Sequence, residues 1–170
     1  MSVEKLAKAV LARLLAAWRM RYGRKQGHGL GQQLPSGLPF EIVEEERLAR
    51  FLKHKSCFSA TKGVVKYAAF LPGRHDGKTS VFRHPGEPAM ELWTIGCRAL
   101  ASDVTVYGAG IVVASDVKRA GLEVIASEPP PRHANIEGWP LHDDPDMAKA
   151  AQREVAKAVA EHATLLLRSP

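Results

Sequence analysis

The chain has 170 residues, of which 45% are hydrophobic and 25% charged, and its formal net charge at pH 7 is +6. A chain of this length can bury roughly 70% of its unfolded surface in one domain, and it has no run near the ~20 apolar residues that a membrane span needs. Charged residues interrupt the apolar N-terminal stretch, so we expect no secretory signal, no transmembrane segment and a cytoplasmic location.

The excess positive charge lies at the N-terminus. Residues 1–30 carry seven basic side chains and one acidic side chain, and the rest of the chain carries seventeen of each sign. Any contact with nucleic acid is therefore expected from residues 5–25 and not from the balanced remainder. The candidate contacts nearest the end of this segment are Arg19, Arg21, Arg24 and Lys25.

Residues 1–22 predict a basic amphipathic helix. Apolar side chains between residues 3 and 18 recur at i, i+3, i+4 and i+7. This stripe must be covered by the domain, a second copy or a partner protein, and the basic face also suits nucleic acid or an anionic membrane. Residues 23–38 are rich in Gly and Gln and predict a flexible linker, so we expect a compact domain at 39–170.

The first half of that domain is expected to hold a helix and a β-hairpin. Residues 40–53 have acidic residues near their start and basic residues near their end, which favours a helix. Strand-like runs at 64–71 and 79–84 flank the turn-forming connector PGRHDGK, which predicts a hairpin. Period-two alternation places Phe82 in the core and turns Arg83 away from it, where Arg83 can pair or bind.

The second half is expected to alternate between helices and strands. Gly96 lies inside a predicted helix, which indicates close approach to another element. The triplet Gly108-Ala109-Gly110 is interpreted as a bulge or tight hairpin between two strands, because a lone GxG is weak evidence for phosphate binding. The predicted elements are a helix at 88–101, strands within 104–114, a helical turn at 115–121 capped by Ser115, a strand at 122–126, and a helix at 145–167 capped by Asp144.

These elements predict an α+β fold. A mainly antiparallel, hairpin-rich sheet of about five strands would be covered by the helices at 88–101 and 145–167. The basic amphipathic helix would extend from this domain on its flexible linker.

Residues 128–140, EPPPRHANIEGWP, hold the densest group of chemically capable side chains. The prolines favour an extended backbone, and irregular loops of this kind often carry function. His133 is the candidate catalytic acid or base, and Asn135 is a candidate to orient it or to stabilise an oxyanion. Anion binding and stacking suggest further binding residues, namely Arg132, Trp139, Arg83 and His54.

The same residues also have a structural interpretation. His133 and Asn135 would then bond their own backbone, and Trp139 would plug the edge of the core. A divalent metal at His133, His142, Asp143 and Asp144 is a further alternative, but helix capping accounts for Asp144, so we expect no metal and no cofactor.

The cysteines and one short family resemblance limit which types of site the chain can contain. Cys57 and Cys97 lack zinc-ligand spacing, which argues against a zinc site or a disulfide framework. The run His133-Ala134-Asn135 after three prolines resembles the His-Pro-Asn stretch of ubiquitin-conjugating enzymes. That family needs a cysteine shortly downstream, and this chain has none after Cys97, so we assign no activity from the resemblance.

Three functional hypotheses follow, of which the third is a purely structural subunit whose N-terminal helix docks into a larger assembly. The first is a small accessory protein that docks to a protein complex or to nucleic acid through its basic N-terminal helix, with residues 129–140 as a recognition site. The alternative is a metal-independent hydrolase or transferase that uses His133 on a phosphate-containing or nucleotide-like substrate. The sequence does not decide whether the chain is an enzyme.

Overall fold

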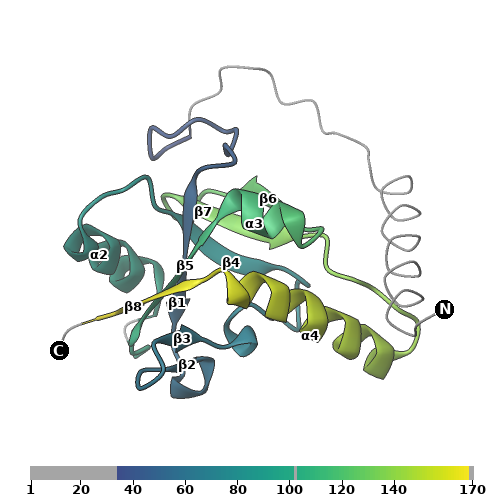
Figure 1. Cartoon of the computed structure of the whole chain (residues 1–170). Helices are drawn as coiled ribbons and strands as arrows, with labels where there is room; N and C mark the ends of the chain where they lie inside the picture. Colours follow the sequence, from purple (N-terminus) through teal and green to yellow (C-terminus); the bar gives the residue numbers. More distant parts are fainter. Residues whose placement is uncertain (1–33, 102, 169–170) are drawn as a thin grey trace. The chain divides into compact units, whose positions relative to one another are not determined.

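The computed structural model describes residues 34–101 and 103–168. The chain divides into two units, Met1–Gln32 and Gln33–Pro170, and the described residues belong to the second (Figure 1). The predicted N-terminal helix and most of the predicted linker lie outside the described residues. The same holds for the candidate contacts Arg19, Arg21, Arg24 and Lys25.

One eight-stranded antiparallel sheet forms the centre of the described domain, in the order β2-β3-β8-β5-β1-β4-β7-β6. The strands are β1 Arg47–Leu52, β2 Phe58–Ser59, β3 Val64–Val65, β4 Thr79–Arg83, β5 Gly108–Val113, β6 Glu123–Ala126, β7 His133–Glu137 and β8 Thr164–Leu167. The helices among the described residues are α2 Ala89–Ala99, α3 Ala114–Arg119 and α4 Pro145–Glu161, with short 3₁₀ turns η1 Lys55–Cys57 and η2 Tyr67–Ala69. The predicted α+β class and antiparallel sheet are confirmed, with more strands than expected.

The helices lie on opposite faces of the sheet, so its central strands are buried on both sides (Figure 1). In β1, Leu48 and Leu52 face the core under α3 and α4, whereas Ala49 and Phe51 face α2. Phe82 of β4 is buried on the α2 side, as predicted. The described part contains no helix long and apolar enough to cross a membrane.

The predicted helix at 88–101 is confirmed as α2, and Gly96 explains how closely it packs. A Cβ on Gly96 would lie 2.7 Å from Phe51 Cε1 of β1. Only glycine lets the helix backbone approach the sheet to this distance, which accounts for a residue that otherwise weakens a helix. The cap predicted for the last helix is also present, because the Asp144 carboxylate accepts from the Asp146 backbone N–H at 2.8 Å.

The helix predicted at 40–53 is wrong. Residues 47–52 form β1, a central strand between β4 and β5. A strand buried on both faces carries nearly continuous apolar residues, so its pattern resembles that of a short buried helix. Tertiary pairing on both edges decides in favour of the strand.

The hairpin predicted from 64–71 and 79–84 is also wrong. Val64–Val65 pairs with β2 and β8, whereas Thr79–Arg83 pairs with β1 and β7. The connector does make a local turn, because Gly73 N–H donates to the Lys78 carbonyl at 2.8 Å. The 3₁₀ turn η2 separates the two strands before that turn, so turn chemistry does not lead to pairing here.

Three boundaries in the second half differ from the prediction. The Gly-Ala-Gly triplet is neither bulge nor hairpin but lies inside β5, where a Cβ on Gly108 would be 2.5 Å from the Leu166 carbonyl oxygen. Helix α3 begins at Ala114, its N-cap is Val113 without a side-chain bond, and Ser115 is therefore not the cap. The last helix ends at Glu161, and 164–167 form β8.

The stretch 128–140 is not one extended loop. Residues 127–132 connect β6 to β7 as a tight turn, in which Arg132 has φ +65° and the Glu128–Pro129 and Pro129–Pro130 peptide bonds are cis. Residues 133–137 then form β7, between β4 and β6. His133 and Asn135 are therefore strand residues with orientations fixed by the sheet.

Residues 34–38, assigned by sequence to the linker, contact the domain. Leu34 packs against the buried cluster that α4 covers. The Ser36 backbone N–H and hydroxyl both donate to the Glu128 carboxylate, at 2.9 and 2.5 Å. The described domain therefore includes at least part of the segment before Pro39.

Candidate functional site

Strands β4, β7 and β6 bring polar side chains together on one face at the edge of the sheet. The register places Ser80 opposite Asn135, and Asn135 opposite Ile125. Two residues further along β4, Phe82 lies opposite His133 of β7. Two residues before Ser80, Lys78 forms a 2.8 Å ion pair with Glu137. We call this surface the polar face, made of Lys78, Ser80, Ile125, His133, Asn135 and Glu137.

Ser80 and His133 form a hydrogen-bonded pair on the polar face. Ser80 Oγ lies 2.7 Å from His133 Nε2, and His133 Nδ1 lies 2.7 Å from the carbonyl oxygen of Ser127. A carbonyl oxygen can only accept, so Nδ1 carries the proton, and in the neutral ring Nε2 accepts the proton of the Ser80 hydroxyl. The backbone thus selects the tautomer that a serine nucleophile needs.

Packing and backbone contacts hold both partners in place. The His133 ring meets Phe82 edge to face, with centroids 5.4 Å apart. Beneath Ser80, the Arg50 guanidinium donates to the Ser80 and Ala69 carbonyl oxygens, each at 2.7 Å. Burial lowers the pKa of Arg50, and the charges of Cys57 and Asp76 act in the opposite direction. Arg50 belongs to the opposite face of β1 from Phe51 and anchors the β4 backbone.

Asn135 is the third polar group of this arrangement. Its residue is only 8% exposed, yet its carboxamide makes no hydrogen bond to any other described residue. Directly opposite residues in an antiparallel pair have Cβ atoms about 5 Å apart, so the side chains of Asn135 and Ser80 are neighbours on this face. A side-chain amide here can donate to an oxygen of a bound molecule.

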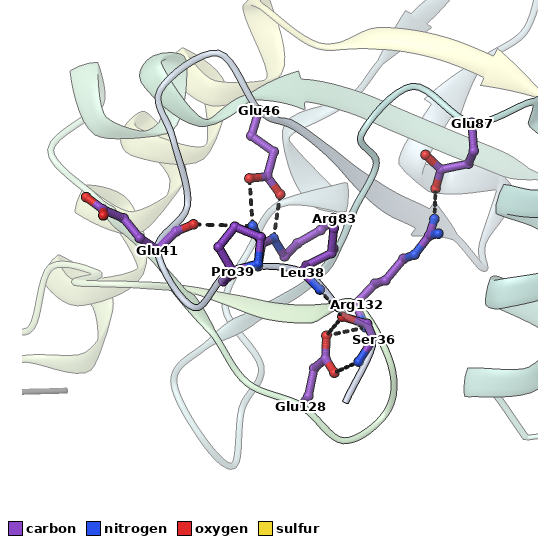
Figure 2. A network of polar contacts seen from close by, with 9 residues as sticks. All are labelled: Ser36, Leu38, Pro39, Glu41, Glu46, Arg83, Glu87, Glu128 and Arg132. Atoms are coloured by element: carbon purple, nitrogen blue, oxygen red, sulfur yellow. Dashed lines mark hydrogen bonds and ion pairs between the residues drawn. The ribbon is translucent and has the colours of Figure 1, made fainter. Parts of the chain in front are cut away.

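Arg132 is occupied by acidic partners. Its guanidinium pairs with Glu87, whose buried side chain lies just before α2 in the sequence. It also pairs with Glu91 of α2 at 3.1 Å. Its backbone N–H donates to the Glu128 carboxylate at 2.7 Å, and Glu128 also accepts from Ser36 (Figure 2). These contacts tie the β6–β7 turn to both α2 and residues 34–38.

Arg83 is buried, with 1% of its surface exposed, and is fully engaged by the segment before β1. Its guanidinium forms a two-pronged pair with the Glu46 carboxylate and donates to the carbonyl oxygens of Pro39 and Glu41 (Figure 2). Arg83 therefore forms an ion pair within the domain, which is one of the two roles, pairing or binding, that the sequence predicted for it. A ligand would have to displace Glu46 to reach this cation.

A buried histidine that the sequence did not single out adjoins these pairs. His84 Nδ1 lies 3.0 Å from the Glu87 carboxylate, and both side chains are less than a tenth exposed. Neither His84 Nδ1 nor Glu87 Oε2 has a hydrogen-bond partner among the described residues. His84, Arg83 and Arg47 also line a small pocket of about 330 Å³ beside Pro39.

The remaining candidate residues do not join the polar face. Trp139 is 3% exposed, and its indole N–H donates to the Ile136 carbonyl at 3.2 Å, which matches the structural interpretation of this residue. His54 is exposed at the start of η1, without a side-chain capping bond. His142 accepts from the Asp144 backbone N–H at 3.0 Å, and within 34–101 and 103–168 no group of three or more His, Cys, Asp or Glu could hold a metal.

A second surface feature is an apolar groove between α2 and β8. It has a volume of about 860 Å³, and its lining is mostly hydrophobic. Met90 and Leu167 at its rim are 79% and 45% exposed. We call it the α2–β8 groove, lined by Ala89, Met90, Trp93, Thr94, Cys97, Arg98, Leu166, Leu167 and Arg168.

Comparison of the chain with protein-family models, curated proteins and solved structures found no match.

Sequence reasoning named His133 and Asn135 as candidate residues and did not name Ser80 or the groove. Alternation in the run His133-Ala134-Asn135-Ile136-Glu137 is a strand signal that could have located β7. The Ser80–His133 contact joins residues 53 positions apart and depends on strand order, which no local pattern specifies. The groove brings Met90 of α2 together with Leu166 and Leu167, which lie more than 70 positions away in the chain, so no local pattern could have indicated it.

Proposed function

We propose that this chain is a small accessory protein that binds a partner protein through the α2–β8 groove and makes a second contact through its basic N-terminal segment. The observation that carries the proposal is the groove itself. Exposed apolar surface that forms a concave feature marks interaction sites more often than scattered exposed residues do. The second contact, to a protein complex or nucleic acid, rests on the charge distribution of residues 1–30.

The charges of the groove select the chemistry of its occupant. Among the described residues that line it, the two charged ones are both arginines, Arg98 on α2 and Arg168 just after β8. Trp93 and Leu166 in its lining are partly buried against the core, whereas Met90 and Leu167 are exposed. The occupant that fits is a segment of a partner protein that combines apolar residues with Asp or Glu. Apolar anchors supply affinity, and the acidic residues supply orientation and selectivity.

In this proposal, residues 129–140 do not bind the partner directly, as the sequence had suggested, but support the wall of the groove. Arg132 and Trp139 are used in internal contacts, so the groove is the better-supported docking surface. The β6–β7 turn instead supports the start of α2 through the Arg132–Glu87 pair, and α2 forms one wall of the groove.

Photo-crosslinking in cells tests the docking surface. The full-length chain carries p-benzoylphenylalanine at Met90, and a control carries it at Met147, which is also exposed and also in the first turn of a helix. We expect a partner crosslinked at Met90 and not at Met147, with the crosslink in a segment that holds apolar and acidic residues. A segment rich in Lys or Arg, or equal crosslinking from both positions, would refute the proposal, as would the absence of any crosslink from Met90.

A direct measurement follows with the synthetic crosslinked segment. Met90→Glu should weaken its binding at least tenfold, because the charge is placed where an apolar anchor sits, and Met147→Glu should leave it unchanged. Arg168→Glu should weaken it by a similar factor through repulsion of the acidic residues.

A further inference from the structure

The polar face has the components of a covalent catalytic site. Ser80 supplies a hydroxyl, His133 supplies a base at 2.7 Å in the required tautomer, and Asn135 supplies an uncommitted carboxamide in the adjacent cross-strand position. Nucleophile, base and a group that orients the base are the three parts of nucleophilic hydrolysis. Here the orienting group is the Ser127 carbonyl in place of a carboxylate.

We propose that Ser80 is an acyl-accepting nucleophile activated by His133, and that the polar face hydrolyses small esters. This activity goes beyond the proposed binding function and does not depend on it.

The reaction proceeds in two steps, acylation of Ser80 and hydrolysis of the acyl-serine. Ser80 Oγ attacks the ester carbonyl carbon while His133 Nε2 takes the hydroxyl proton, and the Asn135 carboxamide donates to the oxyanion. Nε2 then returns this proton to the alcohol oxygen as the C–O bond breaks, which leaves the acyl group on Ser80. Water attacks the acyl-serine, its proton passes through Nε2 to Ser80 Oγ, and the carboxylic acid leaves.

The charges around the pair favour an acyl substrate over the phosphate-containing substrate suggested by sequence. A phosphoryl group needs cations that face the nucleophile. The Lys78 ammonium on this face is paired with Glu137, and Arg132 is held by Glu87. Arg50 belongs to the opposite face of the sheet and donates to backbone carbonyls.

The neighbouring edge strand indicates what the acyl group contacts. Ile125 of β6 is 37% exposed and lies directly across from Asn135, in the same row as Ser80. An apolar side chain at this position suits a short aliphatic acyl chain. We therefore expect butyryl esters to be preferred over acetyl esters.

Labelling with a fluorophosphonate probe tests the nucleophile in the full-length protein. The probe phosphonylates activated serines, and peptide mass spectrometry locates it. We expect the adduct on Ser80, no adduct in Ser80→Ala, and labelling at least about 100-fold slower in His133→Gln, because general-base assistance contributes about 10² or more. Ser115→Ala, which removes another half-buried serine hydroxyl, should be labelled like the wild type.

Two results would overturn the proposal. One is a wild-type protein whose Ser80 stays unlabelled while a serine esterase in the same tube reacts. The other is a folded His133→Gln variant in which Ser80 is labelled at the wild-type rate, which would leave the 2.7 Å contact as a structural hydrogen bond. Because the adduct is located in the wild-type chain, failure of a variant to fold does not remove the test.

Turnover of p-nitrophenyl butyrate then separates the roles of the three groups. Asn135→Ala should lower kcat by about 10²-fold with a smaller change in KM, since an oxyanion donor acts mainly in the transition state. Ile125→Asp should reduce the preference for butyrate over acetate, and Val64→Asp, at another exposed apolar strand position, should not. Wild-type hydrolysis no faster than that of Ser80→Ala would contradict the activity.

Discussion

Removing the charge of Glu46 from its pair with Arg83 should be among the most destabilising single electrostatic changes in this domain. Arg83 is 1% exposed and the Glu46 side chain 9%, so neither charge is well solvated in the folded state. In Glu46→Gln the size is kept and the charge is lost, which leaves a buried guanidinium without its counter-ion. Breaking a buried pair from one side costs about 3–5 kcal/mol. Because glutamine still offers one acceptor oxygen, we expect about 3 kcal/mol.

Urea unfolding gives the measurement. With an m value of about 2 kcal/mol/M, a loss of about 3 kcal/mol lowers the unfolding midpoint by about 1.5 M. The m value itself should not change, because the substitution alters the stability of the folded state and not the surface exposed on unfolding.

Glu44→Gln provides the matched control, two residues away. Glu44 pairs with Lys118 at 3.3 Å, but the two side chains are 65% and 44% exposed. Exposed pairs of this kind contribute about 0–1 kcal/mol, so the midpoint should move by less than about 0.5 M. Equal midpoint shifts in the two variants would show that Arg83 finds solvent or another partner, and the reasoning from burial would be wrong.

Two further predictions concern helix packing and the basic segment. Gly96→Ala should lower the melting temperature even though alanine favours helices, because the added Cβ would meet the Phe51 ring at 2.7 Å; a raised melting temperature would contradict the packing of α2 on β1. If the N-terminal segment binds duplex DNA, replacing four of its cations by glutamine should flatten the slope of log K against log salt by up to about 3.6, or about 0.9 per lost phosphate contact. The same change at four exposed cations of the domain should leave the slope unaltered, and the reverse outcome would assign binding to the domain. The N-terminal set is Arg19, Arg21, Arg24 and Lys25. The domain set is Lys62, Lys66, Arg74 and Lys149.

Elements with local signals could be predicted from sequence, and elements defined by pairing could not. Helix α4 was located because Asp144 and Pro145 specify its start by capping and fixed φ, which are properties of adjacent residues. Strand β1 was missed because Leu48, Ala49, Phe51 and Leu52 are all buried, and a strand covered on both faces loses its alternation.

The glycines of β5 were misread for a related reason. A Cβ on Gly110 would meet Val65 at 3.1 Å and Phe70 at 3.4 Å, so the residue is explained by segments more than 35 positions away. Such close approach is visible only after the sheet has been assembled. A glycine pair in an apolar run indicates either a turn or a crowded strand, and the sequence alone does not separate the two.

The polar face shows how the core selects a surface arrangement. A slip of one residue between β4 and β7 would turn every side chain of one strand to the opposite face and separate Ser80 from His133. That slip is prevented on the buried side, where Val81, Ala134 and Ile136 have no exposed surface. Thr79 adds a specific restraint, because its buried hydroxyl donates to the Phe70 carbonyl at 2.8 Å. The contacts that fill the core therefore also fix the register that places the hydroxyl of Ser80 against the imidazole of His133.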